Sequence, residues 1–153
     1  MKGLFMPVVI QPPKDRDRKD WDRLYQGYAQ FYGVVQTPAM RDTVWAWIID
    51  ANHPTQALLA RTDAGAAVGL AHFRPYPRPL TASTGGFLDN LFVDPGARGT
   101  GVAASLIAAV NAYGQKQGWT VLRWITAQDN DRARRLYDEV AIVTPWVTYD
   151  IKR

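Results

Sequence analysis

The stretch VDPGARGTGVAASL, residues 93–106, most constrains how this chain can fold, because it joins a strand pattern to a helix pattern through two closely spaced glycines. Residues 87–93 form an apolar run typical of a strand, and residues 102–117 carry apolar side chains on one helical face. A helix N-terminus leaves backbone N–H groups unpaired and carries partial positive charge. Because Gly99 and Gly101 add no Cβ, the loop can wrap a phosphate group. The pattern predicts a phosphate site, although a tight turn without a ligand needs similar glycines.

Two common phosphate-binding motifs do not fit this loop. Gly99, Gly101 and Ala104 have the G-x-G-x-x-A spacing of dinucleotide-binding loops. In those loops the glycines follow the strand directly, near the start of a long domain, whereas here DPGAR intervenes and only about fifty residues remain. A P-loop does not fit because no Gly-Lys-Ser/Thr follows. What remains is a loop with Pro95 and Arg98 ahead of two glycines at a helix N-terminus.

The rest of the chain alternates between strand and helix patterns. In chain order we predict a strand at 5–11, helices at 20–33 and 39–50, strands at 56–62, 66–76 and 87–93, a helix at 102–117, a strand at 119–126, a helix after residue 130, and closing strands at 141–144 and 146–151. Residues 75–86 are rich in proline and glycine and are predicted to be a loop. With no internal repeat and no candidate boundary, the order predicts one α/β domain over residues 1–153.

The composition narrows the function classes. The chain has no cysteine, which excludes disulfides, thiolate metal sites and acyl-cysteine intermediates. Its two histidines, His53 and His72, lack metal-ligand spacing, so we expect them in the core or on the surface and expect no metal. No apolar run approaches the ~20 residues of a membrane span and no signal-peptide pattern is visible, so we expect a cytoplasmic protein without a membrane partner. The net charge of +4 suits an anionic ligand, but no nucleic-acid recognition motif is visible.

Two blocks resemble the GCN5-related N-acetyltransferases (GNAT). VDPGARGTGVAASLI resembles the acyl-CoA signature of that family (Arg or Gln, x, x, Gly, x, Gly or Ala), through Arg98, Gly99, Gly101 and Ala103. WITAQDNDRARRLYDEV is similar to the family's strand and Asn-x-x-Ala-x-x-Leu-Tyr helix, through Asn130, Ala133, Leu136 and Tyr137. DWDRLYQGYAQFY, FLDNLFV and WVTYDI are similar to fungal histone and polyamine acetyltransferases, near the diamine acetyltransferases. Two departures are Ala103 where many members have glycine, and EVAIV in place of Leu-Gly-Phe/Tyr.

The resemblance implies a GNAT fold, with a mixed, mostly antiparallel sheet of six to seven strands that splays open at the acyl-CoA site, flanked by about four helices. It implies acetyl-CoA as the cosubstrate, with the pantetheine arm between residues 87–93 and 121–126. The N–H groups of Leu91 and Val93 would bind the acetyl carbonyl or a pantetheine amide, and a preorganised oxyanion donor is typically worth about 2.7 to 4 kcal/mol. The residues implied at the cofactor are Leu91, Phe92, Val93, Arg98, Gly99, Thr100, Gly101, Val102, Ala103, Asn130 and Arg134.

The resemblance also suggests which residues act on the amine and the thiolate. Asp89 is the candidate to deprotonate the acceptor amine, directly or through water, and binding the positive charge of the acceptor or capping local backbone are equal alternatives. By spacing alone Tyr137 is typical of a core residue, whereas the resemblance implies a general acid that protonates the coenzyme A thiolate. The aromatic stripe of residues 20–33 is typical of core packing, and Tyr28 or Tyr32 is our candidate to hold an ammonium group by cation–π contact.

The combined reading predicts an enzyme that transfers acetyl from acetyl-CoA to a primary amine by direct attack. The acceptor would be a polyamine, a small amine or amino acid, or a lysine side chain, and the family suggests a homodimer. One rival is a non-catalytic acyl-CoA binding module that uses the same loop. A second rival, a basic nucleic-acid binding protein, would bind DNA with steep salt dependence.

Overall fold

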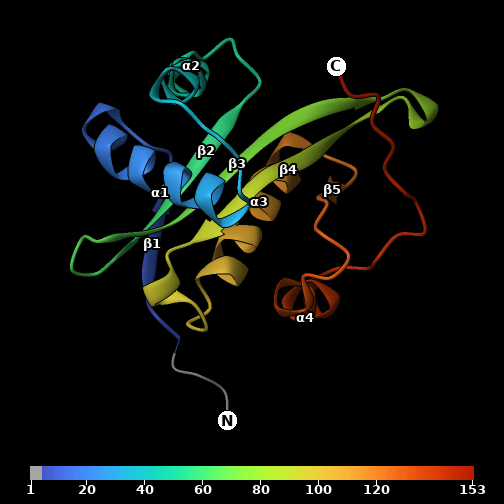
Figure 1. The fold of residues 1–153 in the computed structure, drawn as a ribbon. Coiled ribbons are helices and arrows are strands. Elements are labelled where there is room, and N and C mark those ends of the chain that lie inside the picture. The colour runs from blue at the N-terminus through green and yellow to red at the C-terminus, as the bar shows by residue number, and fades with distance from the viewer. Residues whose placement is uncertain (1–4) are drawn as a thin grey trace.

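The computed structural model describes residues 5–153, in which five strands form one sheet in the order β1-β2-β3-β4-β5 (Figure 1). The strands are β1 (Val8–Gln11), β2 (Gln56–Thr62), β3 (Ala67–Arg78), β4 (Ser83–Val93) and β5 (Leu122–Arg123). The helices are α1 (Arg18–Phe31), α2 (Pro38–Ile49), α3 (Val102–Gln117) and α4 (Asp131–Val140), with short 3-10 turns η1 (Asp15–Asp17), η2 (Pro79–Thr81) and η3 (Pro95–Ala97). Neighbouring strands are antiparallel from β1 to β4, and β4 and β5 are parallel. The predicted α/β class and the mixed, mostly antiparallel sheet are confirmed.

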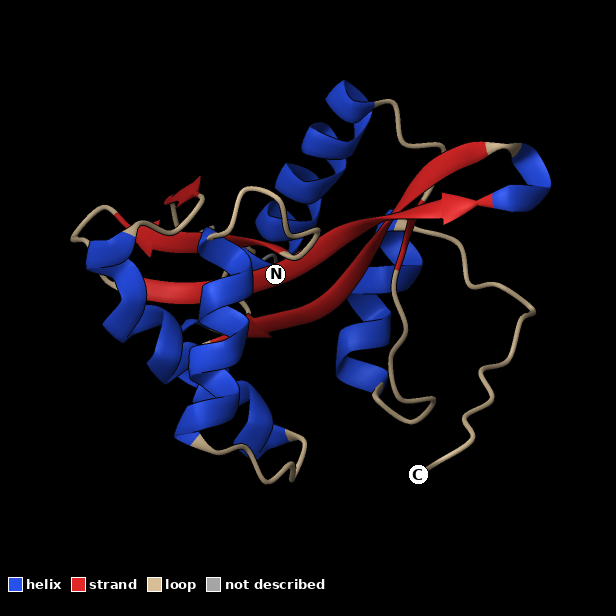
Figure 2. Cartoon of the chain, turned by 90° about the horizontal axis from the view of Figure 1, so that it is seen from above, coloured by secondary structure: helices blue, strands red, loops and turns tan. Residues whose placement is uncertain are grey.

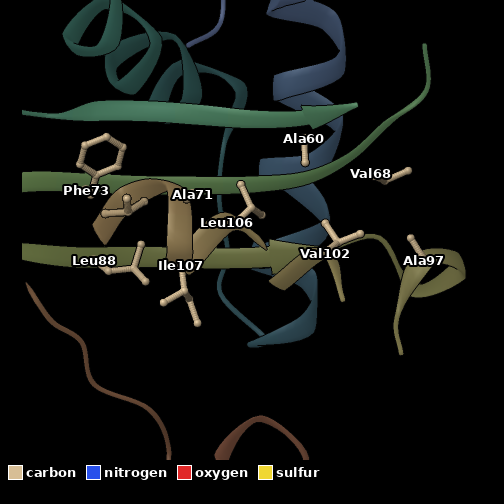
Figure 3. Close-up of a cluster of buried hydrophobic side chains, with 10 residues drawn as sticks. Ala60, Val68, Ala71, Phe73, Leu88, Ala97, Val102, Leu106 and Ile107 are labelled. Atoms are coloured by element: carbon tan, nitrogen blue, oxygen red, sulfur yellow. The ribbon is translucent and has the colours of Figure 1, made fainter. Parts of the chain in front are cut away.

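Helices cover both faces of the sheet, and each face has its own core (Figure 1). On the face of α1 and α2, which we call the α1 face, Trp21 packs with Leu70 in one buried cluster. On the opposite α3 face, Leu106 packs with Ala71 in the other cluster (Figure 3). Successive residues of a strand point to opposite faces, so β3 supplies both cores. Its burial is continuous from residue 67 to residue 73, as expected for a strand covered on both sides.

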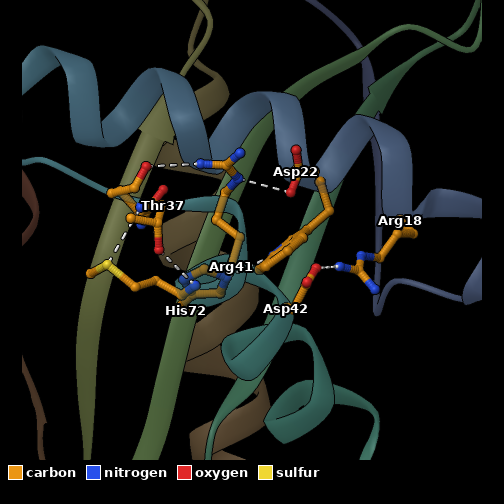
Figure 4. A network of polar contacts seen from close by, with 9 residues as sticks. Arg18, Asp22, Thr37, Arg41, Asp42 and His72 are labelled. Atoms are coloured by element: carbon orange, nitrogen blue, oxygen red, sulfur yellow. Dashed lines mark hydrogen bonds and ion pairs between the residues drawn. The ribbon is translucent and has the colours of Figure 1, made fainter.

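Polar contacts join α1 to α2 (Figure 4). The Arg41 guanidinium of α2 donates to Asp22 of α1 at 2.9 Å and to the Gln36 carbonyl at 3.3 Å, and Arg18 pairs with Asp42. Arg41 is only 5% exposed, so removing Asp22 would leave a buried charge without its carboxylate. These contacts hold the two helices as one platform over the α1 face.

Residues 75–86, predicted to be a loop, are instead the two arms of the β3–β4 hairpin and the turn η2 between them. Pro75 lies opposite Gly86 in the strand register. A Cβ on Gly86 would lie 2.1 Å from the Trp119 indole ring. The prediction was wrong because glycine in a strand also marks a place where another group approaches the backbone closely.

Within residues 5–153 the sheet has five strands, fewer than the expected six to seven. Of the strand predicted at 119–126, only Leu122–Arg123 forms a strand, although the backbone of Thr120 and Val121 also hydrogen-bonds to β4. Residues 141–144 and 146–151, predicted as closing strands, belong to no strand in the described part of the chain. Figure 2 shows this C-terminal segment as a loop that runs apart from the sheet. The sequence pattern of these two segments is typical of strands, but a strand also needs a neighbouring strand to pair with its backbone N–H and C=O groups.

A bulge interrupts β4 at Asp89. His72 of β3 lies opposite Asn90, and the next residue, Phe73, lies opposite Leu88, so Asp89 has no partner in the β3 register. A bulge adds one residue and changes which face the following side chains point to. Asn90 therefore lies on the α1 face with His72, whereas Leu88 packs into the core of the α3 face. Asp89 therefore marks the position in β4 at which the alternation of side chains between the two faces of the sheet is reversed.

Candidate active site

The glycine loop connects β4 to α3 through a backbone that requires glycine. Gly99 and Gly101 have φ angles of +77° and +84°, in the left-handed region that other residues rarely adopt. Gly101 is also the N-cap residue of α3. The N–H of Met6 donates to the Thr100 carbonyl at 2.8 Å, and the Thr100 hydroxyl donates to the Ala97 carbonyl. Both polar groups of Thr100 therefore hold the loop in shape.

The N-terminus of α3 is suited to a phosphate group. Among residues 5–153, no side chain caps this helix. The first-turn N–H groups, which include those of Val102 and Ala103, have no carbonyl partner within the helix and carry partial positive charge. The side chain of Val102 is buried in the core of the α3 face, so only its backbone can meet a ligand. The donor set here consists of backbone N–H groups, as phosphate loops require.

Arg98 is held on the α1 side of the loop. Its Nε donates to the Val93 carbonyl at 3.3 Å. Its guanidinium carbon lies 5.0 Å from the ring centre of Phe31 and 5.8 Å from that of Phe92, within cation–π range. A groove of about 520 Å³ opens beside these side chains, between α1 and the loop after β4. The structure thus positions Arg98 next to the glycines with a fixed orientation.

The sheet splays open next to the glycine loop. β4 and β5 pair only at Gly86 with Leu122 and at Phe87 with Arg123. Beyond Phe87, residues 88–93 have no strand partner on the β5 side within the described chain. Leu91, Phe92 and Val93, expected at the cofactor, lie along this open edge. The side chain of Phe92 itself is buried under α1, and the register directs its backbone groups toward Leu70 of β3, so Leu91 and Val93 are the residues whose N–H groups face the open edge.

Asp89 is an exposed residue at the bulge, with a partly covered side chain, on the same stretch of β4. Arg74 Nε donates to its Oδ1 at 3.2 Å. Burial raises the pKa of the Asp89 carboxyl, and the Arg74 charge opposes this by lowering it, with a net upward shift. Burial raises the pKa values of Tyr25 and Tyr28, and the Asp89 charge adds a smaller upward effect. A carboxyl group with a raised pKa suits proton transfer near neutral pH.

Two tyrosines at the end of α1 lie against each other and act on a third tyrosine in α4. The rings of Tyr28 in α1 and Tyr32, the C-cap residue of that helix, lie 4.8 Å apart. Burial, with smaller effects from Tyr32 and Tyr28, raises the pKa of Tyr137 in α4 to about 12. Tyr137 also packs edge-on against Trp124, with ring centres 5.4 Å apart. A tyrosine with this pKa remains protonated at neutral pH and can donate its hydrogen.

Asn130 and Arg134 bond within their own segment. Asn130 is the N-cap residue of α4, where its Oδ1 accepts from the Ala133 N–H at 3.4 Å. Arg134 Nη1 donates to the Gln128 carbonyl at 2.8 Å. These contacts give both residues a structural role in the turn before α4.

Sequence reasoning missed a buried polar chain on the α1 face. His72, expected in the core or on the surface, is 2% exposed. Its Nε2 accepts from Trp21 Nε1 at 2.9 Å, and its Nδ1 lies 2.9 Å from Asn90 Oδ1. The available signal was the pair of polar residues, Asp89 and Asn90, inside the apolar run FLDNLFV. Their link to His72 depends on the strand register, which a single sequence does not contain.

In residues 5–153, no three side chains of His, Cys, Asp or Glu gather where they could hold a metal ion. Within the same range, none of the helices has the length and apolar character needed to cross a membrane.

Comparisons with known proteins agree with this geometry. The model of the acetyltransferase (GNAT) family matches residues 21–141. The chain is 29% identical to the D-amino-acid N-acetyltransferase HPA3 of Saccharomyces cerevisiae over 143 residues, which cover 93% of this chain and 89% of the relative. The solved ribosomal-protein-alanine N-acetyltransferase of Brucella melitensis biovar Abortus 2308 superposes with a TM-score of 0.80 at 26% identity, covering 96% of this chain and 99% of the other.

An aminoglycoside N-acetyltransferase, AAC(6')-Iy, solved in complex with CoA, has the same fold, with a TM-score of 0.82 at 23% identity over 97% of this chain and 96% of the other. The family match covers well over half of the sequence and includes the β4 bulge, the glycine loop and Tyr137. The chain therefore belongs to the acetyltransferase (GNAT) family and is an acetyl-CoA-dependent N-acetyltransferase.

Proposed function

We propose that this protein transfers the acetyl group of acetyl-CoA to a small primary amine by direct attack of the amine. The observation that carries the proposal is the open edge of β4, which carries Asp89 and leads to the glycine loop. The residues needed at the amine and at the thiolate would come from separate elements, Asp89 from β4 and Tyr137 from α4. The yeast relative named for D-amino acids supports an amino acid as one acceptor.

The cosubstrate would supply an acetyl thioester, and this chain would bind it through its backbone. Gly99, Gly101 and the first turn of α3, with Thr100, Val102 and Ala103, would hold the pyrophosphate, assisted by Arg98. Leu91, Phe92 and Val93 would bind the pantetheine arm and the acetyl carbonyl along the edge of β4. Asn130 and Arg134 would stand nearby on α4. Free N–H groups at a helix start and along an unpaired strand edge support this assignment.

The two proton steps would use Asp89 and Tyr137. Asp89 would bind the acceptor ammonium and accept a proton from it, since an amine attacks only through its lone pair. Tyr137 would donate its hydroxyl hydrogen to the departing thiolate. The raised pKa of each group keeps the carboxylate basic and the tyrosine protonated.

Asp89→Asn is expected to lower kcat/KM for the amine by about tenfold to hundredfold or more, because it removes a charge that both of its candidate roles require. If Asp89 is a base, the variant should have a lower kcat, and its activity should no longer fall as the pH is lowered. In the wild-type protein that fall is expected because the Asp89 carboxylate, whose pKa is raised, takes up a proton. If Asp89 only binds the charge of the amine, the variant should have a higher KM for the amine at nearly constant kcat. Wild-type kinetics for the variant at every pH would remove Asp89 from the site.

The function itself is tested by thiol release from acetyl-CoA in the presence of D- and L-amino acids, polyamines, aminoglycosides and lysine peptides. Turnover with one of these amines is the expected result. Coenzyme A binding without thiol release for any amine would contradict the proposal and favour a non-catalytic acyl-CoA binding module.

We also propose that residues 1–153 form one acetyltransferase domain that acts as a homodimer. The support for the dimer is the C-terminal segment after α4, whose exposed apolar side chains are Ile142, Val143, Trp146, Val147, Tyr149 and Ile151. β5 is the last strand of the sheet and has an open edge. A second copy of this chain would cover the segment by pairing it with that edge.

Val147→Asp combined with Tyr149→Asp is expected to convert a dimer into a monomer of 17.1 kDa, because both residues lie on one side of the alternating segment and would meet the partner's sheet. Light scattering after size exclusion measures the mass. Thr148→Asp, on the other side of the segment, is the matched control and should remain dimeric. A monomeric wild-type protein at micromolar concentration would contradict the dimer.

A further inference from the structure

A row of hydrogen bonds crosses the α1 face and ends at the backbone of Asp89. It starts in α1 at Trp21, which is fully buried and packs on Trp45 of α2 with ring centres 5.1 Å apart. The Trp21 indole N–H donates to Nε2 of His72 in β3 at 2.9 Å, and Nδ1 of His72 lies 2.9 Å from Asn90 Oδ1 in β4. Asn90 Nδ2 donates to the Asp89 carbonyl at 2.9 Å. We call the side chains of Trp21, His72 and Asn90 the polar bridge.

The chemistry of the polar bridge allows one direction for each bond. An indole N–H only donates, so Nε2 of His72 accepts and the hydrogen of the neutral ring sits on Nδ1. Burial lowers the pKa of His72 to about 4, which keeps the ring neutral at physiological pH. Nδ1 therefore donates to Asn90 Oδ1, and the amide nitrogen of Asn90 is left for the Asp89 carbonyl. The orientation of the Asn90 amide is thus set from α1.

Asp89 depends on the polar bridge because its backbone has no strand partner. The register of β4 against β3 passes from Asn90 to Leu88 and skips Asp89. On the other side, β5 pairs with residues 86 and 87 alone within the described chain. The Asn90 amide therefore supplies the hydrogen bond that the Asp89 carbonyl would otherwise receive from a neighbouring strand.

The carboxylate of Asp89 has a weaker support of its own. Arg74 Nε donates to Oδ1 at 3.2 Å, and the two side chains are 40% and 30% exposed. Exposed ion pairs of this kind contribute little to fixing a geometry. The polar bridge is anchored in the core at Trp21 and His72, where the loss of one member leaves a buried polar group without a partner. The bridge is therefore the firmer constraint on the bulge.

Resting on the proposed function, we propose that the members of the polar bridge are positioning residues, which fix the bulge of β4 and thereby hold the Asp89 carboxylate in place for the amine. They act through Asp89 and not through contact with a substrate. A displacement of about 1 Å can lower a rate by about a hundredfold. Loss of the bridge is therefore expected to lower kcat/KM for the amine by about tenfold to hundredfold.

The test is a double-mutant cycle between His72→Leu and Asp89→Asn. It uses the most rapidly acetylated amine among D- and L-amino acids, polyamines, aminoglycosides and lysine peptides. Alone, His72→Leu should lower kcat/KM for this amine by about tenfold to hundredfold. In the Asp89→Asn background it should lower kcat/KM by less than about twofold, because the carboxylate that it serves is already gone. A purely structural role would lower the folded fraction by the same factor in both backgrounds.

Two substitutions that differ by one methylene separate the two bonds of the imidazole. His72→Asn places an amide nitrogen close to the position of Nδ1 and can still donate to Asn90, so it should regain most of the lost activity. His72→Gln reaches toward Trp21 instead and should resemble His72→Leu. Equal values for all three variants would overturn the role of the bond to Asn90.

Nitrogen-15 NMR of the histidines gives a readout that does not depend on turnover. We expect the ring hydrogen of His72 on Nδ1 at pH 7, and a hydrogen on Nε2 would overturn the directions of the bridge. His53→Leu is the matched control for the kinetics, since His53 accepts from the neighbouring Thr55 N–H and takes no part in the bridge.

Equal losses for His72→Leu in the two backgrounds, or no loss in the first, overturn the proposal and leave the proposed function standing. If His72→Leu does not fold, Asn90→Leu at its partly buried position takes its place in the cycle. Wild-type kinetics in Asp89→Asn would remove Asp89 from the site and the role of the bridge with it. Absence of thiol release with every amine overturns the proposed function itself.

Discussion

Tyr137→Phe is expected to lower kcat by about a hundredfold or more while KM for acetyl-CoA stays within about twofold, as general acid catalysis contributes about 10² to 10⁴. The substitution removes one oxygen and keeps the ring that packs edge-on against Trp124. Binding of the cosubstrate should therefore persist, and the loss should fall on the step in which the thiolate departs. Steady-state kinetics with a saturating amine measure both constants.

The pH profile adds a second readout for Tyr137. Because its pKa is about 12, the wild-type hydroxyl keeps its hydrogen throughout the neutral range, so the loss in Tyr137→Phe should be nearly the same from pH 6 to pH 9. Tyr113→Phe is the matched control, because Tyr113 packs against Phe73 and Trp119 away from the cleft. A variant with wild-type kcat at all pH values would show that Tyr137 has no part in the reaction.

Gly101→Ala is expected to weaken acetyl-CoA binding by about tenfold or more, because an L-residue in the left-handed region costs about 1–2 kcal/mol. Gly101 has a φ of +84° and is the N-cap residue of α3. Its new Cβ would also lie 2.4 Å from the Phe5 ring, which would have to move aside. The loop would relax away from the shape that presents its N–H groups. Isothermal titration with coenzyme A measures the change.

The same loop offers a graded series of controls. Gly99→Ala, with a φ of +77° and open space around its Cβ, should show the cost of the backbone conformation alone. Gly96→Ala, with open space and no positive φ, should bind coenzyme A like the wild-type protein. Equal affinity for all three variants would mean that the glycines serve the turn and not the ligand.

The parts of the structure that sequence predicted well depend on local rules. The four helices follow from apolar spacing and from end signals such as Thr37, which caps α2, and Gly118, which ends α3 in the left-handed region. The glycine loop was predictable for a similar reason, because Gly99 and Gly101 have the positive φ angles that the turn itself requires. Local rules therefore predicted the conformation of the glycine loop.

The parts that sequence did not predict depend on partners distant in the chain. The glycine at position 86 signalled a loop, but it makes room for Trp119, more than thirty positions away. The bulge at Asp89 exists only in the register of β4 against β3, and the orientation of Asn90 depends on His72 across that register. The acceptor half of the site as we propose it depends on such pairings, which appear only in three dimensions.

The separate cores on the two faces of the sheet bear on how such a protein can diverge. The glycine loop is anchored to α3 and its core, whereas the tyrosines near the amine belong to α1 and the opposite core. Distant sites without shared contacts respond to mutation almost independently. Arg98 joins the two sides, because it packs on Phe31 of α1. Substitutions in α1 that leave Phe31 and this contact in place should therefore change which amine is accepted without weakening the binding of acetyl-CoA.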